Sequence, residues 1–408
     1  MAKNKLIVGL DVGSYKTRVV VGVGDEGGAL NILGIGISPS QGIRKGTVID
    51  VEETIQNISD AIEDAERVSG EPIYNAFIGI GGRDVASFES RGVIAISHAG
   101  NEIIEEDVDR VLDASQAVSL PPNHRVLRVI PKSYSVDEQK NIKHPVGMVG
   151  IRLEANTQVL TALAPTVKNI EKCVHKAGVD INDTIPNLIA APEAVLSRHK
   201  KELGCVVIDM GCGCTNVTIF EEGSLLHATA IPVGGESITN DIAICLRTSI
   251  DTAEKLKIEY GTCISEAVKE KEKIDLSTIS RIDTQEVSKK YLAEVIEARY
   301  REIFSLVKAE LVKINRDGML PAGAILCGGA VKLHGTIELA REIIGLPVQV
   351  GIPAEIKGML DKADDPSFAT AIGIAAWGMK LESASYGSSF SISDSLSGLK
   401  KWFKNLLP

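Results

Sequence analysis

The chain has 408 residues, of which 44% are hydrophobic and 24% charged, and its formal net charge is −10 at pH 7. This length and composition predict a globular protein of two or more domains with a large buried core. The negative charge argues against a nucleic-acid-binding protein, and the sequence predicts neither a signal peptide nor a membrane-spanning run of about 18 apolar residues.

The first half of the chain begins with strand patterns. The spacing of apolar residues between 51 and 69 then predicts a helix. The predicted strands cover residues 6–12, 18–23, 30–36 and 75–80. From residue 83 to 166 the pattern changes to a small α+β unit with a helix at 103–117, which we expect to be inserted into the first domain outside its main sheet. A helix at 167–177 follows.

The second half starts near residue 200 with a buried strand and a return strand at 216–220. The later patterns predict a largely helical region, a buried strand ending in a Gly-Gly turn, a short strand and a helix of small residues, at 237–315, 322–330, 345–350 and 367–379. Ser and Gly residues between 380 and 395 predict a flexible linker.

Two segments, 6–17 and 204–215, share one pattern: a buried strand, an Asp, one residue, a Gly and a polar turn. In both, the chain returns as a strand, unlike a P-loop or Rossmann turn, which leads into a helix. Each alone could be an ordinary tight hairpin. Asp11 and Asp209 are 198 positions apart (209 − 11), which predicts two similar domains facing each other across a cleft. This is the arrangement of the α/β actin-like ATPase fold, in which two RNase-H-like halves enclose a nucleotide.

A nucleotide in this cleft needs phosphate donors and a metal environment. Backbone N–H groups and one ammonium group are the predicted donors, from Gly13, Ser14, Tyr15, Lys16, Gly211, Gly213 and Thr215. Asp11 and Asp209 would orient Mg²⁺ through water, because Mg²⁺ gives up its waters reluctantly. Lys16 could instead be an ordinary lysine at the edge of a strand.

The base and ribose need a flat surface and polar groups. Gly328 and Gly329 would let a flat ring lie against the backbone, and Glu254 and Lys257 share one helix face. That pair could equally be a surface ion pair. Hydrolysis needs a residue that positions water, for which Asn187 and Glu193 are the candidates. Neither carries a strong signal, so at most weak ATPase activity is expected.

The seven cysteines are odd in number and scattered, and three of them, Cys205, Cys212 and Cys214, lie in or beside the second motif. A Cys-x-Cys segment without a second pair is not a zinc pattern. We expect the cysteines to be small buried residues of a protein in a reducing compartment.

The segment 396–408 predicts an amphipathic helix with an apolar face, flanking lysines and no acidic residue. The residues that define it are Leu396, Leu399, Lys400, Lys401, Trp402, Phe403, Lys404, Leu406 and Leu407. Such a helix after a flexible linker is typical of an in-plane anchor for anionic membrane lipids. It could instead dock on the protein itself or on a partner. One short helix gives reversible binding, so firm attachment predicts self-assembly.

The chain resembles the FtsA family, actin-like bacterial proteins that tether the FtsZ ring to the membrane during division. The resemblance is carried by the terminal helix and by the segments 9–14, 43–50, 145–148, 150–155, 234–242, 253–257 and 292–299. It implies ATP binding, including a contact from Gly235, polymerisation into protofilaments, and a place on the cytoplasmic face of the membrane at the septum. It also implies that Arg299 and Glu302 bind the FtsZ C-terminal peptide. Cys214 departs from the family's glycine-rich turn and leaves the role of Thr215 open.

The resemblance also implies the domain boundaries. Subdomain 1A would comprise 1–82, 167–199 and the helix 367–380, interrupted by subdomain 1C at 83–166. Subdomain 2A would comprise 200–236 and 321–366, interrupted by subdomain 2B at 237–320. A linker at 381–395 and the membrane helix at 396–408 would follow.

Two other functions remain alternatives at this point. A pilus-assembly actin homologue would also bind a short peptide, but it would lack an amphipathic terminal helix of its own. A small-molecule kinase of the same superfamily would need an acidic general base facing an open substrate pocket, and the terminal segment would be unexplained.

Overall fold

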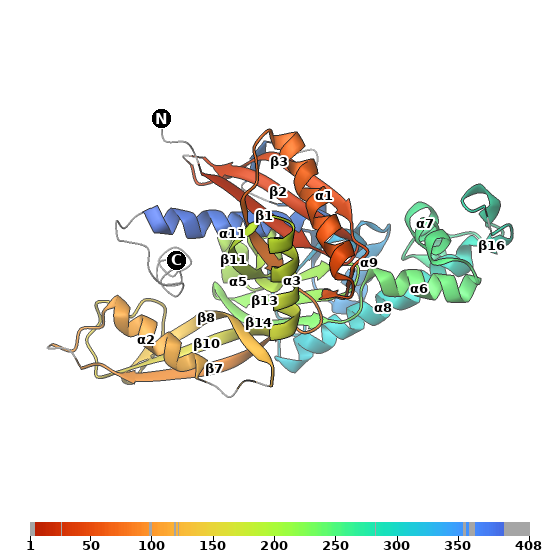
Figure 1. Ribbon diagram of the computed structural model, residues 1–408. Helices are drawn as coiled ribbons and strands as arrows, with labels where there is room; N and C mark the ends of the chain where they lie inside the picture. Colours follow the sequence, from red (N-terminus) through yellow and green to blue (C-terminus); the bar gives the residue numbers. More distant parts are fainter. Residues whose placement is uncertain are drawn as a thin grey trace.

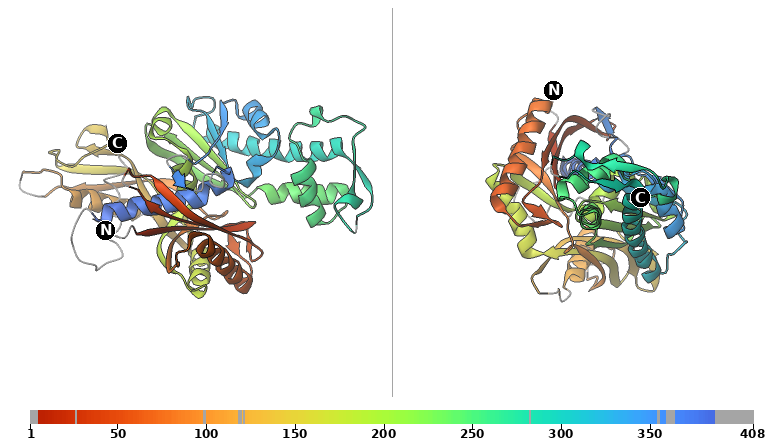
Figure 2. Two further views of the ribbon diagram at one scale, coloured as in Figure 1. Left: turned by 90° about the horizontal axis from the view of Figure 1, so that it is seen from above. Right: turned by 90° about the vertical axis from the view of Figure 1, so that its right-hand side faces the viewer.

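The computed structural model describes residues 5–386 except 26, 98–99, 118–119, 121, 282, 354–355 and 359–363. The predicted membrane helix and most of the predicted linker therefore lie outside the described residues. The described chain is elongated, with the inserted unit at one end and a helical subdomain at the other (Figures 1 and 2).

The first half is built on a six-stranded sheet with the order β11-β6-β1-β2-β3-β19. Its strands are β1 (Leu6–Val12), β2 (Lys16–Gly24), β3 (Leu30–Pro39), β6 (Asn75–Ile80), β11 (Asp180–Pro186) and β19 (Ile356–Gly358). Helices α1 (Val51–Ser69) and α3 (Ala164–Lys176) cover one face (Figure 1). The small hairpin of β4 (Ile43–Arg44) and β5 (Thr47–Val48) precedes α1.

The second sheet has nine strands in the order β18-β17-β12-β13-β14-β7-β10-β8-β9. Its second-half strands are β12 (Cys205–Met210), β13 (Thr215–Glu221), β14 (Ser224–Ile231), β17 (Ala324–Cys327) and β18 (Val348–Val350). The inserted unit contributes β7 (Ala86–Ala95), β8 (His124–Val136), β9 (Gln139–Ile142) and β10 (Arg152–Leu163), with α2 (Glu105–Gln116) packed on β7. One residue pair, Thr229 with Ala86, joins the two groups of strands.

The inserted unit is therefore outside the first half's sheet, as predicted, but its strands continue the sheet of the second half. It has a hydrophobic core of its own, in which Ile103, Val111 and Leu153 are buried. This separate core makes it a distinct unit, which hydrogen bonds of Ser87 with Ala228 and of Gln158 with Leu226 also connect to β14.

The region predicted to be largely helical contains α6 (Gly235–Leu246), α7 (Ile250–Tyr260) and the long α8 (Lys289–Lys313). It also holds a small hairpin of β15 (Lys273–Asp275) and β16 (Glu286–Ser288). Helix α9 (Thr336–Ile344) packs against α8. The described chain also contains the short helix α5 (Arg198–Leu203) and four short 3₁₀ turns, Ser265–Ala267, Leu276–Thr278, Gly329–Lys332 and Pro366–Phe368.

Helix α11 (Ala369–Tyr386) returns from the second half and packs on the first, against β1 and α4 (Asn187–Val195). The contacts are backbone to backbone. A Cβ on Gly9 would lie 2.6 Å from the carbonyl oxygen of Ala371, and one on Gly373 would lie 1.8 Å from that of Ala190. Only glycine allows this approach.

The predicted boundary between helix and linker was wrong. Residues 381–386, assigned to the linker, continue α11 as far as Tyr386. The sequence contains no glycine or proline between Lys380 and Gly387, so nothing in the backbone ends the helix at the predicted place.

Candidate functional site

A cavity of about 540 Å³ lies between the two halves, a volume typical of small-molecule and cofactor sites. Both strand–turn–strand motifs open into it. The predicted nucleotide-site residues that line it are Asp11, Gly13, Ser14, Tyr15, Lys16, Asn187, Asp209, Gly211, Gly213, Gly235, Glu254, Lys257, Gly328 and Gly329. The structure thus brings together residues that are up to 318 positions apart (329 − 11).

The two hairpins have the same register. Val12 pairs with Thr17 in the first and Met210 pairs with Thr215 in the second, so each turn contains four residues. Thr215 therefore corresponds to Thr17, and Cys214 to Lys16. Relative to the first hairpin, Cys214 therefore does not shift Thr215.

Thr215 is the predicted phosphate-site residue that the structure does not bring to the cavity. Its side chain is fully buried, and its hydroxyl donates a hydrogen bond to the carbonyl oxygen of Val233 at 2.8 Å. Thr17 is buried in the same way, with its hydroxyl 2.9 Å from that of Ser40. In each hairpin the threonine is the first residue of the return strand that pairs with the outgoing strand. Because side chains alternate along a strand, those of the two threonines point away from the cavity, and their hydrogen bonds fix the hairpins on that side.

Asp11 and Asp209 are the next-to-last residues of β1 and β12, at the floor of the cavity, and both are more than nine-tenths buried. Asp11 accepts a hydrogen bond from Asn187 Nδ2 at 3.3 Å, and burial raises its pKa from 3.8 to about 6, opposed by Arg18. Asp209 accepts from Asn216 Nδ2 at 3.0 Å and from the Thr370 hydroxyl at 3.3 Å. Burial also raises the pKa of Asp209.

The two candidates for positioning water have different surroundings. Asn187 is the first residue of α4, directly after β11, and lines the cavity. Its Oδ1 is buried without a hydrogen-bond partner in the described part of the chain, so it can accept from a water molecule. Glu193 lies at the other end of α4, where it forms ion pairs with Lys201 and Lys380. Because Glu193 does not line the cavity, the structure leaves Asn187 as the candidate.

Glu254 and Lys257 lie in the cavity wall. The Lys257 ammonium donates to Glu254 Oε2 at 2.6 Å, to the hydroxyl of Thr239 at 2.8 Å and to the carbonyl oxygen of Gly235 at 3.2 Å. Both side chains of the pair are mostly buried. This excludes the alternative of a solvent-exposed surface pair, and it adds Thr239, which the sequence analysis had not selected.

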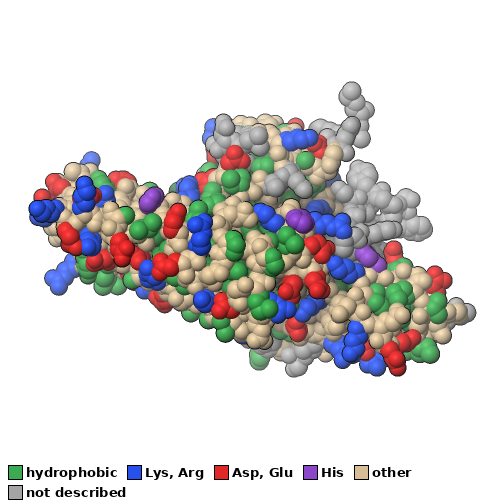
Figure 3. Space-filling view, turned by 180° about the vertical axis from the view of Figure 1, so that it is seen from behind, with side chains coloured by type: hydrophobic (Ala, Val, Ile, Leu, Met, Phe, Trp, Pro, Cys, Tyr) green, Lys and Arg blue, Asp and Glu red, His purple; other side chains and the backbone are tan. Residues whose placement is uncertain are grey.

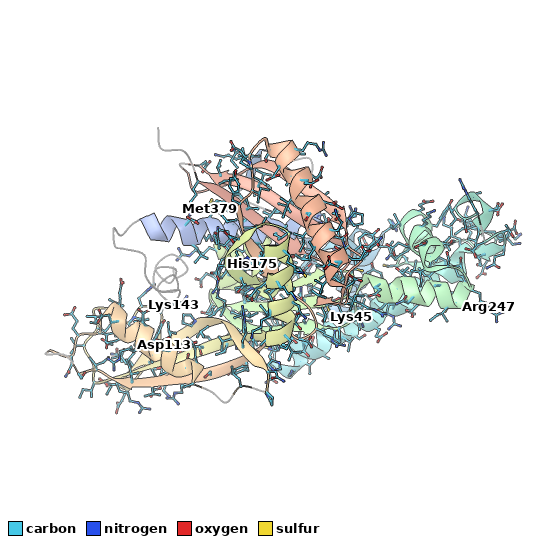
Figure 4. The ribbon with its side chains drawn as sticks, viewed as in Figure 1. Lys45, Asp113, Lys143, His175, Arg247 and Met379 are labelled. Atoms are coloured by element: carbon cyan, nitrogen blue, oxygen red, sulfur yellow. The ribbon has the colours of Figure 1, made fainter. Side chains whose placement is uncertain are left out.

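The hairpin of β4 and β5 connects the two halves at the cavity mouth. The backbone N–H of Gly46 donates to the hydroxyl of Ser14 at 3.1 Å, and Lys45 Nζ donates to the carbonyl oxygen of Pro232 at 3.0 Å (Lys45 is labelled in Figure 4). A Cβ on Gly213 would lie 2.8 Å from the Cα of Lys45. The second turn therefore needs glycine at position 213.

Several lining residues were missed, namely Arg18, Cys212, Cys214, Asn216 and Phe368. Aligning the two motifs would have found some of them, because Arg18 and Asn216 occupy the same position seven residues after the Asp. The seven cysteines are free thiols, and the expectation that they are buried was wrong for Cys245, which is exposed, and for Cys212, which is partly exposed. Burial raises the pKa of Cys212 to about 11 and that of Cys214 to about 12. Both thiols are therefore protonated at neutral pH.

Arg299 and Glu302 lie on α8 outside the cavity lining. Arg299 Nη2 donates to Asp241 Oδ1 at 2.9 Å, and Nη1 pairs with Glu302. Asp241, on α6, was not selected from the sequence. The face of the molecule in Figure 3 has interspersed acidic and basic side chains.

Within the described residues, no group of three or more His, Cys, Asp or Glu side chains is placed to hold a metal ion. The cavity floor offers two carboxylates, which fits a cation held partly through water. In the same part of the chain, no helix has the length and apolar character needed to cross a membrane.

Two protein-family models match the chain. The model described as "Cell division protein FtsA" matches residues 206–373, and the model described as "SHS2 domain inserted in FTSA" matches residues 82–161. The second match covers nearly the whole of the unit predicted at 83–166.

Similarity to individual proteins extends over almost the full length. The chain is 39% identical to the cell division protein FtsA of Pseudomonas aeruginosa, over 98% of this chain and 97% of that protein. It is 36% identical to the FtsA of Bacillus subtilis, over 92% and 83%. It is 33% identical to the FtsA of Escherichia coli, over 92% and 90%.

Solved structures share the fold at low identity. A PilM–PilN type IV pilus biogenesis complex matches with a TM-score of 0.66 and 15% identity, over 91% of this chain and 98% of that chain. MreB5 of Spiroplasma citri bound to ADP matches with a TM-score of 0.56 and 12% identity, over 94% and 99%. These likenesses confirm the actin-like ATPase fold predicted from the paired motifs.

Proposed function

The chain belongs to the FtsA family of actin-like cell division proteins, and on this basis we propose that it is an ATP-binding membrane tether for FtsZ filaments at the division septum. In this proposal it binds ATP and Mg²⁺ between its two halves, polymerises on the cytoplasmic face of the membrane, and attaches through residues 396–408. The observation that carries the nucleotide proposal is the pair of hairpins, equal in register, that open into one cavity.

The cavity has a phosphate end and a nucleoside end. Backbone N–H groups of both turns, with Lys16, would bind the phosphates, and Asp11 and Asp209 would hold Mg²⁺ through water. Glu254 and Lys257, which the buried hydroxyl of Thr239 contacts, would face the nucleoside, beside the backbone at Gly235, Gly328 and Gly329. Mg²⁺ would neutralise phosphate charge when bound.

Hydrolysis would be weak. The unpartnered Oδ1 of Asn187 can orient a water molecule, but an amide is a poor proton acceptor. The carboxylates nearby already have partners, since Asn187 donates to Asp11 and Asn216 donates to Asp209. ATP would therefore act mainly as a ligand that favours one arrangement of the two halves.

The alternatives have less support. The pilus complex shares 15% identity with this chain, which shows a common fold and nothing about the partner. A small-molecule kinase would need a free carboxylate as a general base. Each lining carboxylate has a hydrogen-bond or ion-pair partner, as Asp11, Asp209, Glu254 and Asp365 show.

ATP binding is tested by titrating the full chain with fluorescent ATP in Mg²⁺. We expect saturable binding, and a loss of about 100-fold or more for Asp209→Ala, because this carboxylate lies at the floor of the cavity. Arg67→Gln, on the outer helix α1, is the matched control and should bind as the parent chain does. Absence of binding by the parent chain would refute the proposal.

The FtsZ contact is tested with a peptide of the FtsZ C-terminus. Arg299→Glu should abolish binding and leave ATP affinity unchanged, since Arg299 is outside the cavity lining. The exchanged pair Arg299→Glu with Asp241→Arg restores an ion pair between α8 and α6. If Arg299 contacts the peptide, the exchanged pair also fails to bind. Recovered binding would instead assign Arg299 a purely structural role.

Membrane attachment is tested by sedimentation with anionic liposomes. Removal of residues 396–408 should abolish binding, and replacement of Lys400, Lys401 and Lys404 by Gln should weaken it on anionic but not on neutral liposomes. Equal sedimentation of the truncated chain would refute this attachment. Electron microscopy on a lipid monolayer with ATP tests filament formation in the same preparation.

A further inference from the structure

Arg18 is a cation at the floor of the cavity that was not selected from either sequence motif. It lies on β2 and pairs in register with Asp11 on β1, so both side chains face the same side of the sheet. At the equivalent position of the second hairpin, Asn216 donates a hydrogen bond to Asp209 at 3.0 Å. Arg18 differs, because its Nε is buried and has no hydrogen-bond partner in the described part of the chain.

A ring holds the guanidinium in place instead of a carboxylate. Arg18 Cζ lies 5.4 Å from the ring centroid of Phe368, in the 3₁₀ turn that precedes α11. Phe368 is 5% exposed, so the ring is fixed. A guanidinium stacked on an aromatic face keeps its N–H edges available for another acceptor.

The charges at the floor of the cavity also favour a phosphate as the acceptor for Arg18. Asp11 and Asp209 repel each other, and the charge of Arg18 opposes the rise in the pKa of both. A phosphate chain entering this space would add further negative charge beside two carboxylates. Lys16, the cation selected from the sequence, lies in the turn with its Nζ 5.7 Å from the ring of Tyr15.

We propose that Arg18 binds the phosphates of the nucleotide and allows the cavity to hold them without a divalent cation. The proposal rests on the proposed ATP binding. A planar guanidinium can donate two parallel hydrogen bonds to phosphate oxygens, a geometry that a lysine ammonium does not offer. Arg18 then neutralises part of the phosphate charge, and Mg²⁺ neutralises more of it when it binds.

The test compares adenosine, ADP and ATP on the full chain by calorimetry, in excess EDTA and in Mg²⁺. Arg18→Gln should reduce ATP affinity in EDTA about tenfold or more, with a smaller loss in Mg²⁺ and none for adenosine. Arg18→Lys, which retains the charge, should recover part of the loss. An equal loss for adenosine and ATP, or no loss in EDTA, would overturn the proposal.

Two controls separate this inference from the function it rests on. If the parent chain binds ATP in Mg²⁺ but not in EDTA, the inference fails and the proposed function stands; if it binds neither way, both fail. Phe368→Leu keeps the charge but removes the stacking ring, and should lose a smaller part of the EDTA affinity. If neither Phe368→Leu nor Arg18→Lys lowers the ATP affinity in EDTA, the stacked, planar guanidinium is not what binds the phosphates. Thermal unfolding without nucleotide verifies that each variant is folded.

Discussion

The two hairpins that meet at the cavity have the same backbone and different chemistry. The first carries Tyr15 and Lys16 in its turn, and Arg18 behind them, whereas the second has Gly213, Cys214 and Asn216 at the same positions. The first turn is partly open to solvent, and the second lies against the hairpin of β4 and β5. One half thus supplies charge and the other supplies close backbone approach. A duplicated motif need not keep the same role in both copies.

The largest expected difference concerns the two carboxylates. Burial raises the pKa of Asp11 from 3.8 to about 6, so the ionised form destabilises the folded state. Since a tenfold change in proton affinity corresponds to about 1.4 kcal/mol, Asp11→Asn should stabilise the nucleotide-free protein by up to about 3 kcal/mol above pH 6. The gain should disappear as pH falls toward 4, where the folded state of the parent binds the proton.

Asp209→Asn should increase the stability of the folded protein less than Asp11→Asn does. Asp209 accepts hydrogen bonds from two side chains and Asp11 from one, so the ionised form of Asp209 is better stabilised. Urea unfolding of both variants and the parent between pH 4 and 8 measures the effect. A gain that is independent of pH would contradict the assignment to burial of the charge.

The next effect concerns the turns themselves. Gly213→Ala would place its Cβ 2.8 Å from the Cα of Lys45, so the hairpin of β4 and β5 must move, at a cost of about 2 kcal/mol. Tyr15→Ala, at the equivalent position, removes an exposed side chain and should change stability by less than about 0.5 kcal/mol. Thermal unfolding of the pair tests the difference, and similar losses for both would remove the contrast between the turns.

The smallest effect is expected where the hairpins are alike. Thr17→Val and Thr215→Val each remove one buried hydrogen bond and should cost about 1 kcal/mol of unfolding free energy. ATP affinity should be unchanged in both, because neither hydroxyl lines the cavity. A selective loss of ATP affinity in Thr215→Val would return this residue to the phosphate site. Thr215→Ser, which retains the hydroxyl, is the control.

Local patterns predicted the elements that follow strong periodicity. The bounds of α1 match the predicted helix, and the two hairpins have the predicted strand–turn–strand form. The strand β11 was missed because Asp180, Asn182 and Asp183 have low strand propensity, which an edge position in the sheet tolerates. The edge strand β18, which has no acidic residue, was predicted within 345–350, so composition rather than position concealed β11.

Long-range relations left no local signal. The inserted unit joins the second half through the strand pair of Thr229 with Ala86 and through hydrogen bonds of Ser87 with Ala228 and of Gln158 with Leu226, which no periodicity marks. The site was predicted from glycines and carboxylates, but the stack of Arg18 on Phe368 joins residues 350 positions apart (368 − 18). Comparing the two motifs position by position was the one sequence route to Arg18.

The seating of α11 on the first half has a mechanical consequence. A pull along the axis of this helix from Tyr386 loads its contacts with Gly9 and Ala190 in parallel, as shear, rather than peeling them apart one by one. Shear over several contacts resists far more force than peeling does. The load would pass into β1, which carries Asp11 next to its end, and into α4, which begins at Asn187. Tension at the end of α11 would thus reach the two elements that carry Asp11 and Asn187 into the lining of the cavity.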